Sequence, residues 1–131
     1  MALQPNTILS GCPVEIWPQH FAVVKAKYVP KDFVAIFNDK EEVTAVVDEQ
    51  HLNSDWTVEV ERGWRMLSFR ITLQFELVGF LAVVAKALAD AQVSIFALSA
   101  YSTDHLLVKD IDLPEAIRCL ELLGCTVTGS P

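Results

Sequence analysis

Basic residues are few in this sequence: ten Lys and Arg stand against 17 Asp and Glu among 131 residues, a formal net charge of −7. Nucleic-acid binding depends on clustered Lys and Arg that neutralise phosphates, and anionic membrane surfaces attract the same clusters. The basic residues are scattered here, and the closest group, Arg62, Arg65 and Arg70, flanks a Trp instead of forming a stripe. We therefore expect neither a nucleic acid nor a membrane as a partner.

Cysteines and long apolar runs are also scarce. Cys12, Cys119 and Cys125 are odd in number and form no C-x-x-C pair, which favours ordinary reduced thiols in a cytoplasmic protein. The longest apolar run, residues 78–85, is far shorter than the roughly 20 residues needed to cross a bilayer. Residues 1–6 contain no basic segment followed by an apolar run, so we expect no signal peptide.

Catalytic motifs are missing as well. The sequence contains no nucleophile elbow, no P-loop and no dinucleotide-binding glycine motif. His20, His51 and His105 lie far apart without the spacing of metal ligands. Asp104 and His105 are neighbours, and neighbours on a strand point to opposite faces, so their adjacency does not make a catalytic dyad. We expect no enzymatic activity, no metal and no cofactor.

The second half of the chain alternates between strand and helix patterns. Residues 66–75 are apolar at every second position, which predicts a half-buried strand. Residues 80–91 are rich in Ala and Leu, and their only charged residues are Lys86 and Asp90, four residues apart. This pattern predicts a helix that the rest of the protein covers on nearly all sides. Next come a strand at 93–101, a turn at 102–104 and a strand at 105–109, which together predict a hairpin.

A second helix is predicted from its start and stop signals. Asp112 is a candidate N-cap, Pro114 lies in the first turn, and Glu115 has the position of a capping box. Apolar residues follow at helical spacing: Leu113, Ile117, Leu120 and Leu123. Gly124 ends this helix, and residues 125–128 form a last strand. The order strand, helix, strand, strand, helix, strand predicts a ferredoxin-like α+β fold with both helices on one face of an antiparallel sheet.

The first half contains a degenerate copy of this pattern. Strands are predicted at 20–28, 33–37 and 43–47, the last two forming a hairpin around a turn at 38–42. Only residues 29–32 separate the first two strands, so the copy has lost its first helix. A weak helical turn is expected within 50–58, and 61–65 bridges to the second copy. We expect two halves, 1–62 and 63–131, that share one continuous core.

Three segments resemble the ACT domain family. Residues 91–109, and Arg62-Gly63-Trp64-Arg65 before the strand, resemble the small paired ACT proteins, a group that includes bacterial stand-alone proteins and cytosolic arginine sensors. Residues 76–82 are similar to the general ACT signature of an acid, two residues, Gly and an apolar helix, with Glu76 in place of Asp and Val78 in place of Pro. The resemblance implies a regulatory, allosteric domain that binds amino acids at domain interfaces and is often a dimer.

The chemistry of a free amino acid points to a candidate site. Its carboxylate needs hydrogen-bond donors, which the amides at the start of a helix supply, and Gly79 leaves the backbone open to the ligand. Its ammonium needs an acceptor, which Asp104 at the hairpin tip can provide, with Ser102 and Thr103 adding hydroxyls. The predicted site consists of Glu76, Leu77, Val78, Gly79, Phe80, Ser102, Thr103 and Asp104.

Structural roles compete with these functional ones. Gly79 is equally typical of a tight turn, and Asp104 of a hairpin cap. His105 is expected to be packed or exposed rather than functional, Trp64 to anchor the core, and Glu42 to be a solvated turn charge. The apolar fraction of 52% also suits a module that dimerises without a ligand. For either function we expect self-association, with a homodimer of two-fold symmetry as the commonest form.

Overall fold

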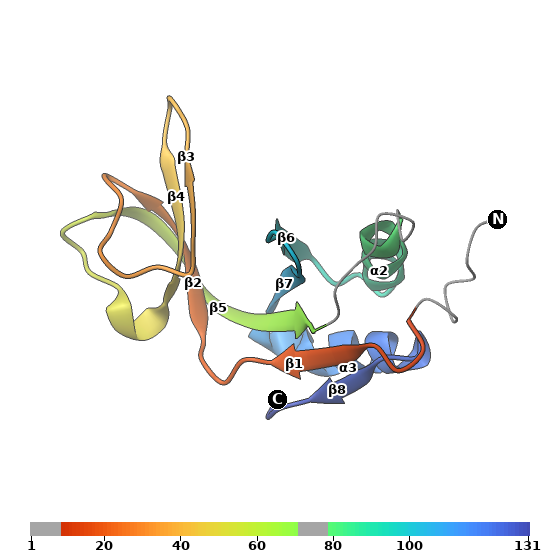
Figure 1. Ribbon diagram of the computed structural model, residues 1–131. Coiled ribbons are helices and arrows are strands. Elements are labelled where there is room, and N and C mark those ends of the chain that lie inside the picture. The colour runs from red at the N-terminus through yellow and green to blue at the C-terminus, as the bar shows by residue number, and fades with distance from the viewer. Residues whose placement is uncertain (1–8, 71–78) are drawn as a thin grey trace. The chain divides into compact units, whose positions relative to one another are not determined.

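The computed structural model describes residues 9–70 and 79–131 (Figure 1). They form two compact units, one made of Gln19–Trp64 and the other of residues 9–18, 65–70 and 79–131. No helix among the described residues is long and apolar enough to cross a membrane. Residues 9–18 thus belong with the C-terminal part of the chain, and the division into halves at residues 62 and 63 stays a prediction.

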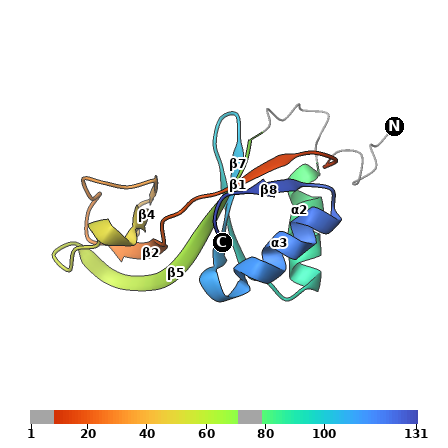
Figure 2. The same ribbon diagram turned by 90° about the horizontal axis from the view of Figure 1, so that it is seen from below.

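The C-terminal unit has the predicted ferredoxin-like order of elements. This order runs β5 (Thr57–Phe69), α2 (Phe80–Asp90), β6 (Ile95–Ser99), β7 (Asp104–Lys109), α3 (Leu113–Leu122) and β8 (Thr126–Thr128), with a 3₁₀ turn at Asp110–Asp112. Only the part of β5 from Arg65 onward belongs to this unit. The α+β fold, with its two helices side by side, is therefore confirmed (Figure 2).

A strand that the sequence did not predict lies inside this sheet. β1 (Pro13–Ile16) pairs antiparallel with β5, with Val14 opposite Phe69, and parallel with β8, with Val14 opposite Val127. The sheet order in this unit is therefore β6-β7-β5-β1-β8. The strand is only four residues long, but its burial alternates as a half-buried strand requires, with Val14 and Ile16 buried.

Alternation along the strands explains how the helices attach. Every second strand residue faces the helices and joins one apolar cluster with them. The strands contribute Val14, Ile16, Leu67, Phe69, Leu106 and Val108, and the helices contribute Phe80, Val84, Leu88, Leu113, Ala116 and Leu120. The intervening strand residues, among them Ser68 and His105, lie on the opposite face of the sheet.

The ends of α3 differ in part from the prediction. Gly124 ends the helix as predicted: it has φ of 103°, and the amide of Cys125 donates to the carbonyl of Leu120 at 3.0 Å. The capping box is wrong. Asp112 makes no side-chain cap because the preceding 3₁₀ turn leaves it at φ −94° and ψ −3°, outside the extended conformation of a capping residue. Glu115 pairs with Arg118 instead.

The N-terminal unit is a small sheet without an α-helix; all its residues, 19–64, are described. Its strands are β2 (Phe21–Ala26), β3 (Ala35–Asn38), β4 (Val43–Asp48) and the first part of β5, in the order β3-β4-β2-β5. The predicted hairpin and the loss of the first helix are confirmed. The helical turn is a 3₁₀ turn at Glu49–His51, and residues 61–65 form part of β5, not a bridge.

Each unit contains a cluster of buried apolar residues. The N-terminal cluster is small and consists of Ala22, Val24, Ala26, Ala45, Val47 and Trp56. The expectation that the two halves share one continuous core stays a prediction. The long strand β5, with 13 residues, supplies a strand to both units.

Candidate ligand-binding site

Gly79 lies at the start of α2, in the left-handed conformation with φ of 97°. A Cβ at this position would meet no atom within 4 Å, so the backbone conformation, rather than lack of space, requires glycine. Among the described residues, the N-cap position Gly79 contributes no side-chain cap to this end of the helix. The first amides of α2 lie at the positive end of an 11-residue helix, which favours an acceptor.

Phe80 has a structural role in this arrangement. Its ring is buried and packs edge-on against Phe69 at 5.1 Å between centroids. That contact fixes the start of α2 on the sheet, so Phe80 offers a ligand its backbone amide rather than its ring. The other predicted residues of this segment, Glu76, Leu77 and Val78, lie outside the described residues.

The hairpin of β6 and β7 places its polar tip residues on two faces. Asp104 pairs with Ser99, and the amide of Ala100 donates to the carbonyl of Thr103 at 2.8 Å, which closes the turn. Alternation puts Asp104 on the same side as the core residues Leu106 and Val108, which is the side that carries the helices. Ser102 is exposed.

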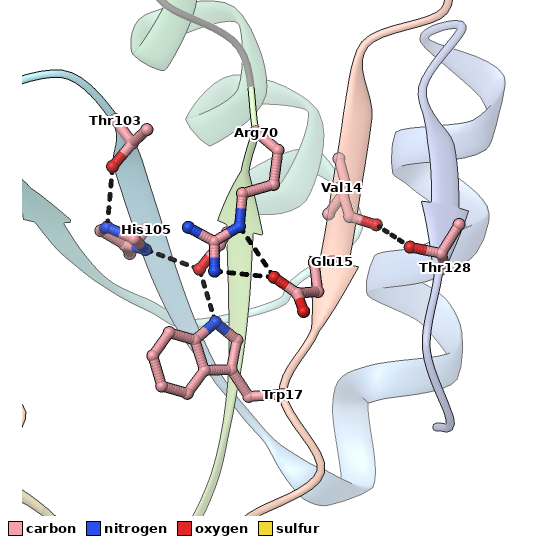
Figure 3. Close-up of polar contacts among 8 residues, drawn as sticks. Val14, Glu15, Trp17, Arg70, Thr103, His105 and Thr128 are labelled. Atoms are coloured by element: carbon pink, nitrogen blue, oxygen red, sulfur yellow. Dashed lines mark hydrogen bonds and ion pairs between the residues drawn. The ribbon is translucent and has the colours of Figure 1, made fainter.

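Thr103 instead belongs to a chain of hydrogen bonds on the helix-free face (Figure 3). Trp17 Nε1 lies 2.6 Å from Ser68 Oγ, and the same oxygen lies 2.6 Å from His105 Nδ1. His105 Nε2 lies 3.1 Å from Thr103 Oγ1. The chain joins the segment after β1, strand β5 and strand β7.

One direction among these bonds is fixed by its donor: Trp17 Nε1 can only donate, so Ser68 Oγ accepts from it. When His105 is neutral with its hydrogen on Nε2, Ser68 Oγ donates to Nδ1 and Nε2 donates to Thr103 Oγ1. Both ring nitrogens of the neutral imidazole are satisfied in this arrangement.

Burial and the charges near this chain of hydrogen bonds change the pKa of His105. Arg70 donates from Nε and Nη2 to Glu15 Oε1, each at 2.7 Å, and its guanidinium carbon lies 5.9 Å from the centre of the Trp17 ring (Figure 3). The pKa of His105 lies below its usual value, first because burial disfavours the charged ring and second because Arg70 is positive; Asp104 opposes this shift.

Ser68 and His105 together have the distance of a nucleophile and its base, but not the setting. Ser68 is 0% exposed, and its oxygen already accepts from Trp17. A substrate has no path to an oxygen in this position, so we assign the pair a structural role. Among the described residues no group of three or more His, Cys, Asp or Glu side chains is placed to hold a metal ion.

The sequence does not predict this chain of hydrogen bonds. It predicts that His105 is packed or exposed rather than functional, and it indicates no role for Trp17 or Ser68. The one available signal was Ser68, a small polar residue among apolar neighbours in a strand. Two other expectations agree with the structure: Trp64 is buried, and Glu42 is an exposed turn residue, 3.8 Å from Lys25 Nζ.

The sequence profile of the ACT domain matches residues 59–121 of the chain. No curated protein matches the chain in sequence. Among solved structures, a protein from Agrobacterium tumefaciens has a TM-score of 0.81 at 22% identity, covering 92% of this chain and 95% of its own. A protein of unknown function from Vibrio cholerae, described as a possible transport protein, has a TM-score of 0.74 at 17% identity and covers 91% and 94%.

Regulatory domains of aspartate kinase share the fold at lower similarity. The ligand-free regulatory subunit of aspartate kinase from Thermus thermophilus has a TM-score of 0.60 at 9% identity, covering 84% of this chain and 95% of its own. At such identities the likeness shows the fold alone. The predicted resemblance to ACT domains is confirmed.

Proposed function

We propose that this protein is a non-catalytic, cytoplasmic sensor that binds a free amino acid and passes the signal on through self-association or a partner. The observation that carries the proposal is the start of α2 at Gly79, a residue without a capping side chain, on the same side of the sheet as Asp104. A helix start attracts a carboxylate, and a carboxylate attracts an ammonium group, so the two features match the two charges of an amino acid.

The site we propose uses the backbone on one side and a side chain on the other. The amides following Gly79 bind the ligand carboxylate, and Asp104 accepts from its ammonium. Ser102, exposed beside Asp104, supplies a further hydroxyl. Thr103 is engaged with His105 and serves to position the hairpin tip. The regulatory role of the aspartate kinase subunit with this fold supports the assignment.

Thermal-shift and calorimetric titration of the full chain with each of the twenty amino acids tests this proposal. We expect at least one of them to raise the Tm at millimolar concentration. Replacing Asp104 by Ala should weaken its binding about ten- to a hundredfold, since a charge-assisted hydrogen bond contributes about 1.5–3 kcal/mol. Stabilisation by none of them would contradict the proposal.

A matched control separates this effect from loss of charge. Asp90 is an exposed acid at the far end of α2, paired with Lys86 at 2.8 Å. Its replacement by Ala removes the same charge without touching the proposed site, so affinity should change by less than about twofold. Equal weakening by both variants would argue that net charge, not Asp104, governs binding.

A second function, dimerisation without a ligand, is favoured by one observation. The N-terminal unit exposes several large apolar side chains on and before β3: Tyr28, Val29, Phe33, Val34 and Phe37. Exposed apolar side chains of this kind suit an interface between proteins. Light scattering after gel filtration separates the two functions, because a homodimer that ignores every amino acid supports the second. A monomer at tens of micromolar would contradict self-association in both.

A further inference from the structure

Two of the three cysteines occupy matching positions on neighbouring strands. β1 and β8 run parallel, with Pro13 opposite Thr126 and Val14 opposite Val127. Cys12 and Cys125 are the next pair back along the same register, and the backbone pairing continues there: the amide of Thr126 donates to the carbonyl of Cys12 at 2.9 Å. Neighbouring strands lie about 4.7–4.9 Å apart, within the Cα separation of about 4.4–6.8 Å that a disulfide spans.

Both side chains point to the same side of the sheet. Cys12 and Cys125 belong to the apolar cluster of this unit, together with Val14, and they are 2% and 6% exposed. The two thiols affect each other: the neighbouring Cys125 thiol lowers the pKa of Cys12, and the Cys12 thiol raises the pKa of Cys125, with burial as the second cause. Cys12 is therefore the thiol better able to ionise.

We propose that Cys12 and Cys125 form a reversible disulfide that ties β1 to β8. This inference is independent of the ligand site. With a hydroperoxide as oxidant, the Cys12 thiolate attacks a peroxide oxygen, the O–O bond breaks, and hydroxide leaves and takes up a proton as water. The resulting sulfenic acid is attacked by the Cys125 thiol, which forms the S–S bond and releases a second water. A dithiol reductant returns both thiols by exchange.

The position in the fold makes this reaction feasible despite burial. β1 has four residues and β8 has three, and the cysteines immediately precede both strands. The ends of such short strands open more readily than the middle of a sheet, which admits a small oxidant. Once Cys12 is oxidised, the second step needs no access from solvent because its partner thiol lies at the matching position beside the neighbouring strand.

The disulfide would close a loop from residue 12 to residue 125, nearly the whole chain. Long loops lose the most conformational freedom in the unfolded state when closed, so the oxidised protein should be more stable than the reduced one. We expect the Tm to rise by roughly 5–15 °C on oxidation. The modification would thus act as a clamp on strand β8.

The test is oxidation of the reduced full chain with hydrogen peroxide, followed by denaturing alkylation with N-ethylmaleimide, intact-mass measurement and peptide mapping. We expect one alkylated thiol per chain, a cross-linked peptide containing Cys12 and Cys125, and its loss on treatment with dithiothreitol. Three alkylated thiols, at a peroxide dose that oxidises a free dithiol of similar concentration, would overturn the proposal.

Cys119 provides the control because it lies on α3 in the same apolar cluster. Cys119→Ala should still form the cross-link and show the rise in Tm, whereas Cys12→Ala and Cys125→Ala should show neither. The peptide map of the unaltered chain decides the matter even if a variant fails to fold. A cross-link to Cys119, or one between two chains, would also refute the assignment.

Discussion

The hydrogen bonds around Ser68 allow a sharp prediction about stability. Ser68→Ala removes the acceptor of the Trp17 indole N–H and the donor to His105 Nδ1, both at 2.6 Å. No water can take the place of the hydroxyl without rearrangement, because Ser68 is 0% exposed. The substitution therefore removes one hydrogen-bond partner from each of two polar groups while adding no clash.

The magnitude follows from the cost of unsatisfied groups. Each buried donor or acceptor left without a partner costs about 1–3 kcal/mol, and Trp17 and His105 are only partly buried, so the lower half of this range applies to each. We expect the free energy of unfolding to fall by about 2–4 kcal/mol in total. For a chain of this size the Tm should fall by roughly 7–15 °C.

Urea unfolding followed by tryptophan fluorescence and by circular dichroism measures this loss. Ser94→Ala is the matched control, because Ser94 is exposed in the same unit and should change the free energy of unfolding by less than about 0.5 kcal/mol. A double-mutant cycle with His105→Gln should show coupling of at least about 0.5 kcal/mol. A Ser68→Ala protein as stable as the control, or additive effects in the cycle, would refute the hydrogen-bond chain.

Three further predictions concern other positions. The pKa of His105 lies below its usual 6.5 in the folded protein. The contribution of the neutral ring to stability is therefore fully present above pH 6.5 and is lost as the pH falls through the folded pKa. When urea unfolding is measured at decreasing pH, His105→Gln should lose less stability than the unaltered chain. Gly124→Ala should cost about 2 kcal/mol in the same assay, because φ is 103° and the new Cβ would lie 3.1 Å from Ser10 Cα. Arg65 is 4% exposed and donates hydrogen bonds to Asp110 and to the carbonyls of Trp17 and Ser130. Arg65→Met should therefore lower the free energy of unfolding by about 2–3 kcal/mol and speed amide hydrogen exchange in β8. Unchanged exchange would contradict the role of Arg65 in anchoring this end of the chain.

Local patterns predicted the elements of the C-terminal unit well. The alternation of Leu67 and Phe69 with polar residues, the Ala- and Leu-rich helix and the stop signal at Gly124 all correspond to the structure. Residues three to four apart on a helix, or two apart on a strand, report on burial without knowledge of the partner. The capping box failed at Asp112 because the 3₁₀ turn before it, itself a local feature, changed its backbone conformation.

Such local patterns could not predict which strands are neighbours in the sheet. Nothing in Pro13–Ile16 indicates that it lies between β5 and β8, because four residues carry little periodicity and both partners are distant in sequence. The chain Trp17–Ser68–His105 likewise depends on contacts across 51 and 37 residues. The candidate ligand site stays a prediction: Gly79 and Asp104 stand at the starts of two elements that the sequence predicts, whereas the face on which Thr103 lies could not be predicted.

The amino-acid sequence by itself determined the fold class, the two helices, the hairpins and the resemblance to ACT domains, because these rest on interactions between residues close in the chain. Only the tertiary structure decided which strands are neighbours and in what register. That choice brought Cys12 beside Cys125, enclosed Ser68 between Trp17 and His105, and gave each unit an apolar cluster. The physical reason is that pairing between distant strands is selected by the burial of whole faces, which no short segment encodes.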